Sequence, residues 1–162
     1  MVGHVGAISD EHAQSSLAGK NILVIGSRSQ RHFLQQALVT EGAKVLTYRT
    51  NVPEDGLTQG NVESIIGDFA LGRFSPRPDM AVICSPIASG NEVPENNPAI
   101  NLALQIKEKE VPVIALNTSG ASTDATRLLR KHGIAYLASP GRLATQMMHI
   151  KDALYSGTQL LG

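Results

Sequence analysis

Positions 20–29 read KNILVIGSRS, and this stretch decides the fold. Its four apolar residues, Ile22–Ile25, form a short continuous run that is typical of a strand buried on both faces. Gly26 indicates a turn directly after the strand. Residues 30–41 then carry apolar side chains at helical spacing, which predicts a helix that ends at Glu41-Gly42. The side chains expected to face inward are those of Phe33, Ala37 and Leu38.

The same alternation of strand and helix continues to the end of the chain. Further strands are predicted at Lys44–Tyr48, Asp79–Cys84, Val111–Leu116 and Ile134–Leu137. Further helices are predicted at Val62–Leu71, Ala99–Glu110, Ala121–His132 and Gly141–Tyr155, with Gly133 as a left-handed cap. This order predicts an α/β domain of three layers with a five-stranded parallel sheet in the flavodoxin-like order 2-1-3-4-5. A Rossmann half with an extra strand is the near alternative.

The chain length and composition fit one globular domain. The chain has 162 residues, of which 42% are hydrophobic and 17% are charged, so we expect a packed core over residues 20–162. Residues 1–19 are rich in Gly, Ala and Ser and are predicted to be a partly ordered leader. Fourteen basic and fourteen acidic residues give zero formal net charge, which argues against nucleic acid and anionic membranes as partners.

The single cysteine and the absence of long apolar runs indicate a reducing, cytoplasmic setting. Cys84 has no second cysteine to form an internal disulfide with. No apolar run reaches the roughly 18 residues of a membrane helix, and the first twenty residues lack the pattern of a secretory signal. A near-neutral surface also tolerates self-association, so a homo-oligomer is plausible.

Small polar residues follow the predicted strands, where ligands bind in open α/β sheets. Backbone N–H groups at helix starts form anion sites, which Arg28 and Arg142 are expected to strengthen. The same residues are also ordinary helix caps and turn residues, so both interpretations stay open. The candidate ligand- or phosphate-binding residues are Gly26, Ser27, Arg28, Ser29, Ser85, Ser89, Gly90, Asn117, Ser119 and Gly120, with a fourth loop at 139–142.

Several common sites are excluded by their missing motifs. The first strand is followed by one glycine instead of G-x-G-x-x-G, and the second ends at Thr47-Tyr48-Arg49 without an acid, so no dinucleotide site is expected. There is no P-loop, and no His or Cys spacing that suits a metal. A response regulator needs an aspartate where this chain has Cys84-Ser85. Cys84 is therefore interpreted as a small core residue.

Three stretches of the chain carry a resemblance to a known family: KNILVIGSRSQ at 20–30, PDMAVICSPIASG at 78–90, and EVPVIALNTSGASTDATRLLRKHGIAYLASPGRLATQMMHI at 110–150. They resemble the ligase domain of the succinyl-CoA synthetase superfamily. The resemblance spans roughly 140 residues and rests mostly on the rhythm of strands and loops. It implies a flavodoxin-like CoA-ligase-type domain over residues 20–162. Gln30 departs from the glycine that is usual at its position in the family.

The resemblance implies one subunit or domain of an acid–thiol ligase forming ADP or GDP. In that superfamily, helix N-termini of two ligase domains cradle a phosphohistidine, so Gly26–Ser29 and Ser85–Gly90 would face it. His4 stands in a G-H-x-G-A-I pattern at positions 3–8, although the family carries its phosphohistidine after the fourth strand. ATP-grasp and CoA-binding partners would supply CoA and ADP or ATP, and no tightly bound cofactor is expected. This chain would not catalyse the full reaction alone.

Two other functions remain open at this stage. One is a stand-alone, non-catalytic Rossmann-like module that binds a small anionic ligand or regulates a partner. The other is a domain similar to the small subunit of dipicolinate synthase, which also opens with a strand, a V-I-G turn and a helix. The sequence of residues 24–26, Val-Ile-Gly, is compatible with that resemblance.

Overall fold

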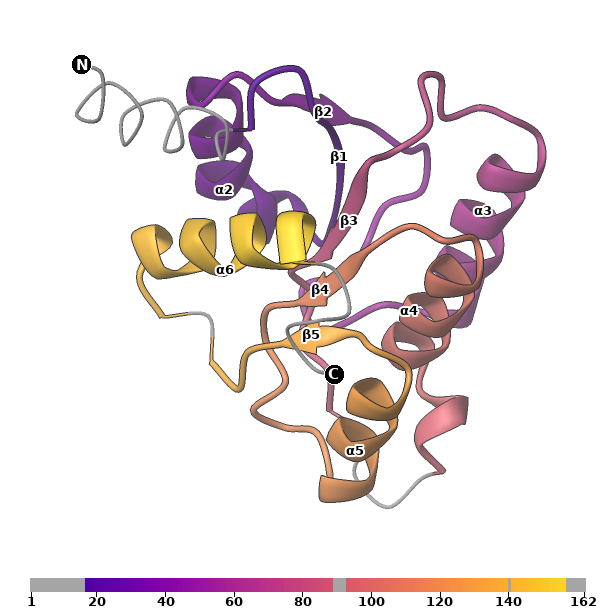
Figure 1. Cartoon of the computed structure of the whole chain (residues 1–162). Helices are drawn as coiled ribbons and strands as arrows, with labels where there is room; N and C mark the ends of the chain where they lie inside the picture. Colours follow the sequence, from indigo (N-terminus) through magenta and orange to yellow (C-terminus); the bar gives the residue numbers. More distant parts are fainter. Residues whose placement is uncertain (1–16, 89–92, 140, 157–162) are drawn as a thin grey trace.

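The computed structural model describes residues 17–88, 93–139 and 141–156, and it confirms the predicted fold class (Figure 1). Five parallel strands form one sheet in the order β2-β1-β3-β4-β5. The strands are β1 (Asn21–Ile25), β2 (Lys44–Leu46), β3 (Met80–Ile83), β4 (Val113–Ala115) and β5 (Ala135–Tyr136). The helices are α2 (Arg28–Thr40), α3 (Gln59–Ala70), α4 (Pro98–Glu108), α5 (Thr123–Lys131) and α6 (Leu143–Ser156), with a short 3-10 turn η1 (Pro94–Asn96).

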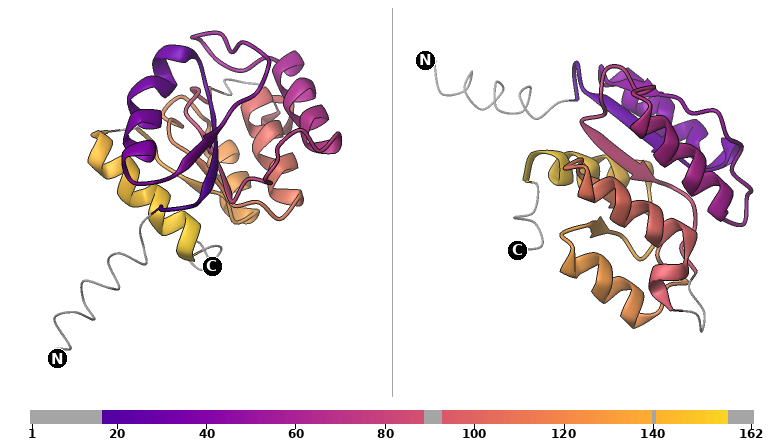
Figure 2. Two further views of the ribbon diagram at one scale, coloured as in Figure 1. Left: turned by 90° about the horizontal axis from the view of Figure 1, so that it is seen from above. Right: turned by 90° about the vertical axis from the view of Figure 1, so that its right-hand side faces the viewer.

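The sheet has helices on both faces, as Figure 2 shows from two sides. Strands β1 and β3 lie in its centre, where Ile22 is opposite Met80 and Ile25 is opposite Ile83. All four residues of β3 are buried, and so are Ile22–Ile25. Successive side chains of a strand point to opposite faces, so each central strand contributes to two apolar layers.

Each face of the sheet has its own hydrophobic cluster. Side chains of α3, α4 and α5 pack on one face, together with Leu23 and Ile25 of β1. Side chains of α2 and α6 pack on the other face, together with Ile22 and Val24. Leu17, which belongs to the predicted leader, is fully buried in this second cluster.

Helix α2 begins two residues earlier than predicted, because Ser27 caps it. The Ser27 hydroxyl accepts a hydrogen bond from the Gln30 N–H, and the Gln30 side chain accepts one from the Ser27 N–H. The prediction that Phe33 faces inward is wrong, since Phe33 is 69% exposed, whereas the same prediction for Leu38 is confirmed. Leu34 is the buried residue that was missed. Leu34 and Leu38 are four positions apart, as Phe33 and Ala37 are, so both pairs match the helical repeat.

Residues with a positive φ angle follow several of the helices and turn the chain back toward the sheet. Gly42, Gly72 and Gly133 follow α2, α3 and α5 with φ of 93°, 67° and 71°, as predicted for Gly42 and Gly133. The N–H of Ile134 donates to the Leu129 carbonyl, which completes the Schellman pattern after α5. After α4 the equivalent position is Glu110, with φ of 63°.

Exchanging the residue type at these two helix ends should change stability in opposite directions. A non-glycine residue with positive φ is disfavoured, so we expect Glu110→Gly to raise the free energy of unfolding by about 1 kcal/mol. Gly133→Ala should lower it by about the same amount. Urea unfolding at pH 7 measures both. Equal stability of the Gly133 variant and wild type would show that α5 ends without a left-handed requirement.

Candidate functional site

The loops that follow β1, β3 and β4 meet at one edge of the sheet. A Cβ added at Gly26 would lie 3.1 Å from the Cβ of Cys84, so the loops after β1 and β3 are in close contact. The N–H of Ile87 donates to the Asn117 carbonyl at 2.9 Å and joins the loop after β3 to the loop after β4. The structure therefore brings the predicted loops together at the carboxyl ends of the strands.

The turn between β1 and α2 is held by Tyr48, which lies two residues after β2, because the strand ends at Leu46 and not at Tyr48 as predicted. The Tyr48 hydroxyl accepts a hydrogen bond from the Gly26 N–H at 2.9 Å and donates one to the Gly26 carbonyl at 2.8 Å. Burial raises the pKa of Tyr48, and the hydrogen bond to Gly26 acts in the opposite direction. Tyr48 thus satisfies both backbone groups of a buried residue next to the helix start.

A glutamate from the loop between β2 and α3 contacts the first turn of α2. The Ser29 hydroxyl donates to the two carboxylate oxygens of Glu54, at 2.6 and 2.8 Å. The Gln30 side-chain amide donates to the Glu54 backbone carbonyl at 2.7 Å. A negative side chain is favourable at a helix N-terminus, so this contact stabilises the start of α2 and fixes the loop against it.

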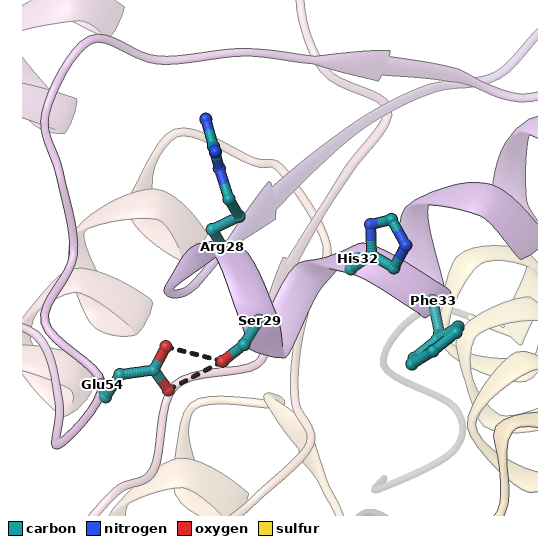
Figure 3. A pocket seen from close by; sticks show the side chains of 5 residues that line it. All are labelled: Arg28, Ser29, His32, Phe33 and Glu54. Carbon is teal, nitrogen blue, oxygen red and sulfur yellow. Dashed lines mark hydrogen bonds between the residues drawn. The ribbon is translucent and has the colours of Figure 1, made fainter.

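An open pocket of about 430 Å³ lies over this helix start (Figure 3). In Figure 3, Ser29 points toward Glu54, and Arg28 extends on the other side of the helix start. The rings of His32 and Phe33 pack edge to face with their centroids 5.0 Å apart. The pocket is lined by Arg28, Ser29, His32, Phe33 and Glu54.

The pocket contains one positive and one negative side chain. Arg28 is exposed and makes no ion pair with any residue that the structure describes. Glu54 has its two carboxylate oxygens hydrogen-bonded to Ser29 and is not ion-paired with Arg28. The residues that line the pocket therefore include an arginine, a glutamate held by Ser29 and an exposed phenylalanine.

The remaining predicted site residues lie outside this pocket. Ser85 is fully buried, and its hydroxyl has no hydrogen-bond partner among the described residues. The Ser119 hydroxyl donates to the side-chain oxygen of Asn117 at 3.2 Å. A Cβ at Gly120 would lie 3.0 Å from Ala88, so this glycine allows the loops after β3 and β4 to approach. His4, Ser89 and Gly90 lie outside the described residues.

Cys84 packs in the core and is not an activated thiol. Its side chain belongs to the cluster under α2 and α6 and is 8% exposed. Burial raises the pKa of Cys84 to about 12, and the nearby Arg31 lowers it by less. The thiol therefore stays protonated at neutral pH, when only a thiolate is a good nucleophile. This agrees with its interpretation from sequence as a small core residue.

Two residues of this site were not found by sequence reasoning. Glu54 lies between the predicted strand Lys44–Tyr48 and the predicted helix Val62–Leu71, and Tyr48 was predicted only as the end of that strand. Both make contacts with residues more than 20 positions away. The hydrogen-bonding capacity of a tyrosine that directly follows a strand is the one signal in the sequence that indicates such a contact.

Residues 17–88, 93–139 and 141–156 contain neither a candidate metal site nor a candidate membrane-spanning helix. No group of three or more His, Cys, Asp and Glu side chains in these ranges is arranged to hold a metal ion. None of the described helices combines the length and the apolar character that crossing a bilayer requires.

Comparison with known proteins shows the fold and no family. A scan against protein families finds no match, and a search of curated proteins finds none. Among solved structures, the chain is similar to a fusion of the trimeric coiled coil of yeast Spc42 to another protein of solved structure. That match has 18% identity and a TM-score of 0.59, and it covers 91% of this chain and 85% of the other.

A weaker match is to a mutant of the receiver domain of the histidine kinase CKI1 from Arabidopsis thaliana. It has 16% identity and a TM-score of 0.42, and it covers 84% of this chain and 92% of the other. We draw no conclusion from a similarity this weak. At these identities, the first match supports the α/β architecture alone.

Burial of Cys84 should make stability depend on alkaline pH. The native pKa of about 12 exceeds the ordinary value of 9.0, so the unfolded state releases the proton first. Stability is therefore lost as pH rises from about 9 toward 12, by at most about 1.4 kcal/mol per pH unit. We expect Cys84→Ala to lose less stability than wild type between pH 8 and 11 in urea unfolding. Parallel pH profiles would contradict the burial of this thiol.

Proposed function

We propose that this protein is a binding module for a small organic anion, and that the anion binds in the pocket at the start of α2. The observation that carries the proposal is that Arg28, which forms no ion pair with any residue that the structure describes, lines this 430 Å³ pocket. The volume lies within the usual range for small-molecule sites, roughly 300–1,000 Å³. The carboxyl edge of the sheet is also where ligands bind in folds of this class.

Arg28 is the residue that we assign to the anionic group. A guanidinium binds carboxylate and phosphate through paired N–H donors, and such charge-assisted hydrogen bonds are the strong ones. Phe33 contributes an exposed ring to the lining of the same pocket, so an aromatic carboxylate fits the pocket better than a bare inorganic ion. Ser29 and His32 complete the wall of the pocket.

Binding without turnover is the simpler function for these groups. The Ser29 hydroxyl is hydrogen-bonded to a carboxylate, and no imidazole is hydrogen-bonded to it among the described residues. Cys84 is buried and protonated, so it does not serve as a nucleophile. A cytoplasmic location is part of this proposal, because a single reduced cysteine fits a reducing compartment.

The acyl-CoA ligase function stays a prediction. Its support is the five-stranded sheet in the order 2-1-3-4-5, which many unrelated functions share. At the start of α2, the N–H groups of Ser27 and Gln30 already donate to side chains within the turn, which leaves fewer donors for a phosphohistidine. Its ATP-grasp and CoA-binding partners, and a homo-oligomer, remain predictions as well.

Loss of the Arg28 guanidinium should weaken binding. We expect Arg28→Ala to raise the Kd for a small aromatic carboxylate by about tenfold or more, because a charge-assisted hydrogen bond contributes about 1.5–3 kcal/mol. Calorimetric titration with 3-phenylpropionate, L-phenylalanine and glycylphenylalanine measures the Kd. Arg142→Ala is the matched control, because Arg142 is also exposed near the carboxyl edge and does not line the pocket.

Two results would overturn the proposal. One is that none of these carboxylates binds to wild type at millimolar concentrations. The other is that Arg28→Ala binds them as tightly as wild type does, which would remove the start of α2 from the site.

A further inference from the structure

Two arginines from separate segments of the chain converge on one buried carboxylate. Asp68 is in the last turn of α3, and its side chain is only 5% exposed. The Nη2 atom of Arg49, which follows β2, lies 3.5 Å from Asp68 Oδ1. The Nη1 atom of Arg73, which follows α3, lies 3.4 Å from the same oxygen. The two guanidiniums are therefore close neighbours, and neither belongs to the pocket at the start of α2.

The end of α3 fixes the position of Arg73. Gly72 follows the helix with φ of 67°, and the next N–H, that of Arg73, donates to the Asp68 carbonyl at 2.9 Å. This is the Schellman pattern of a helix end. Backbone and side chain of Arg73 thus both contact Asp68, so the direction of its guanidinium is set by the same turn.

The chain next to Arg49 is held against the same helix. The side-chain amide of Asn61, which belongs to α3, donates to the Thr50 hydroxyl at 2.7 Å and to the Asn51 carbonyl at 2.8 Å. The backbone that carries Arg49 is therefore fixed to α3 before any ligand binds. Groups that are already in place cost less entropy to use in binding.

Stability alone does not explain the second arginine. Two guanidiniums and one carboxylate leave this cluster with a net positive charge. Arg49 is 70% exposed and makes no hydrogen bond to Asp68, and an exposed ion pair of this kind stabilises a fold by only about 0–1 kcal/mol. A guanidinium has five N–H donors, and among the described residues Arg73 uses one of them on Asp68. Most donors of both arginines therefore remain available to a ligand.

We propose that Arg49 and Arg73 bind the phosphate group of a small molecule. A single guanidinium fork satisfies a carboxylate, whereas a phosphate group has enough oxygens for two guanidiniums to share. The buried carboxylate holds both guanidiniums from below, and the exposed parts of their side chains, 70% for Arg49 and 43% for Arg73, are accessible from solvent. Strand β2 is at the edge of the sheet, so no further strand covers this side of it. This site is independent of the proposed function.

The test is calorimetric titration of wild type with inorganic phosphate, glycerol 3-phosphate and acetate at one physiological ionic strength. We expect saturable binding of phosphate at least about tenfold tighter than that of acetate, because only phosphate engages both arginines. Tighter binding of glycerol 3-phosphate would indicate a phosphate ester as the ligand, and equal binding would indicate free phosphate. Both results support the site.

Neutral replacements show whether these two arginines hold the phosphate. We expect Arg49→Gln and Arg73→Gln each to raise the Kd for phosphate by about tenfold. Arg127→Gln is the matched control, because Arg127 is also exposed and paired with an acid, Asp124, but is on α5. The control should change the Kd by less than about twofold, since exposed charges farther away than a Debye length are largely screened. Melting temperatures check that each variant folds, and the exposed Arg49 is the safer position of the two.

Three results would overturn the inference. They are the absence of saturable phosphate binding, binding of acetate as tight as that of phosphate, and an unchanged Kd for phosphate in Arg49→Gln. The last result would mean that phosphate binds elsewhere on the protein. The proposed function is tested separately by Arg28→Ala with aromatic carboxylates, so failure of either proposal leaves the other standing.

Discussion

Burial of β1 and β3 on both faces is the constraint on which the rest of the structure depends. Each central strand contributes side chains to two apolar clusters, and neither cluster is complete without helices from its own side. Parallel strands require a crossover between them, so each crossover helix begins near the carboxyl ends of the strands and returns the chain to the edge where the next strand begins. The loops after the strands therefore gather where the helices begin, and the candidate site lies there as a consequence of the core.

Two residues between β2 and α3 determine which groups are available at the start of α2. Tyr48 satisfies both backbone groups of Gly26, and Glu54 binds the Ser29 hydroxyl in the next turn. Without them, the start of α2 would be an ordinary helix N-terminus that favours anions. With them, the carboxylate of Glu54 is fixed against the first turn of α2, in a pocket that Arg28 also lines.

Local sequence pattern predicted the elements, and contacts between distant residues determined the site. The alternation of five apolar strands with helices predicted the sheet order, and Gly133 predicted one helix end, because both signals can be read from short stretches of sequence. The inward direction of Phe33 was predicted wrongly, since two apolar sets fit one helical repeat. Glu54 was missed because its partner is 25 positions away.

The most direct test of the central claim is to map the binding site residue by residue. Amide chemical shifts of the 15N-labelled protein would be recorded while glycylphenylalanine is added. The proposed site predicts that the largest shifts belong to residues 27–33 and to residues 54 and 55, which include all the residues that line the pocket. Shifts confined to residues 117–120, or no saturable shifts at all, would contradict a binding site at the start of α2.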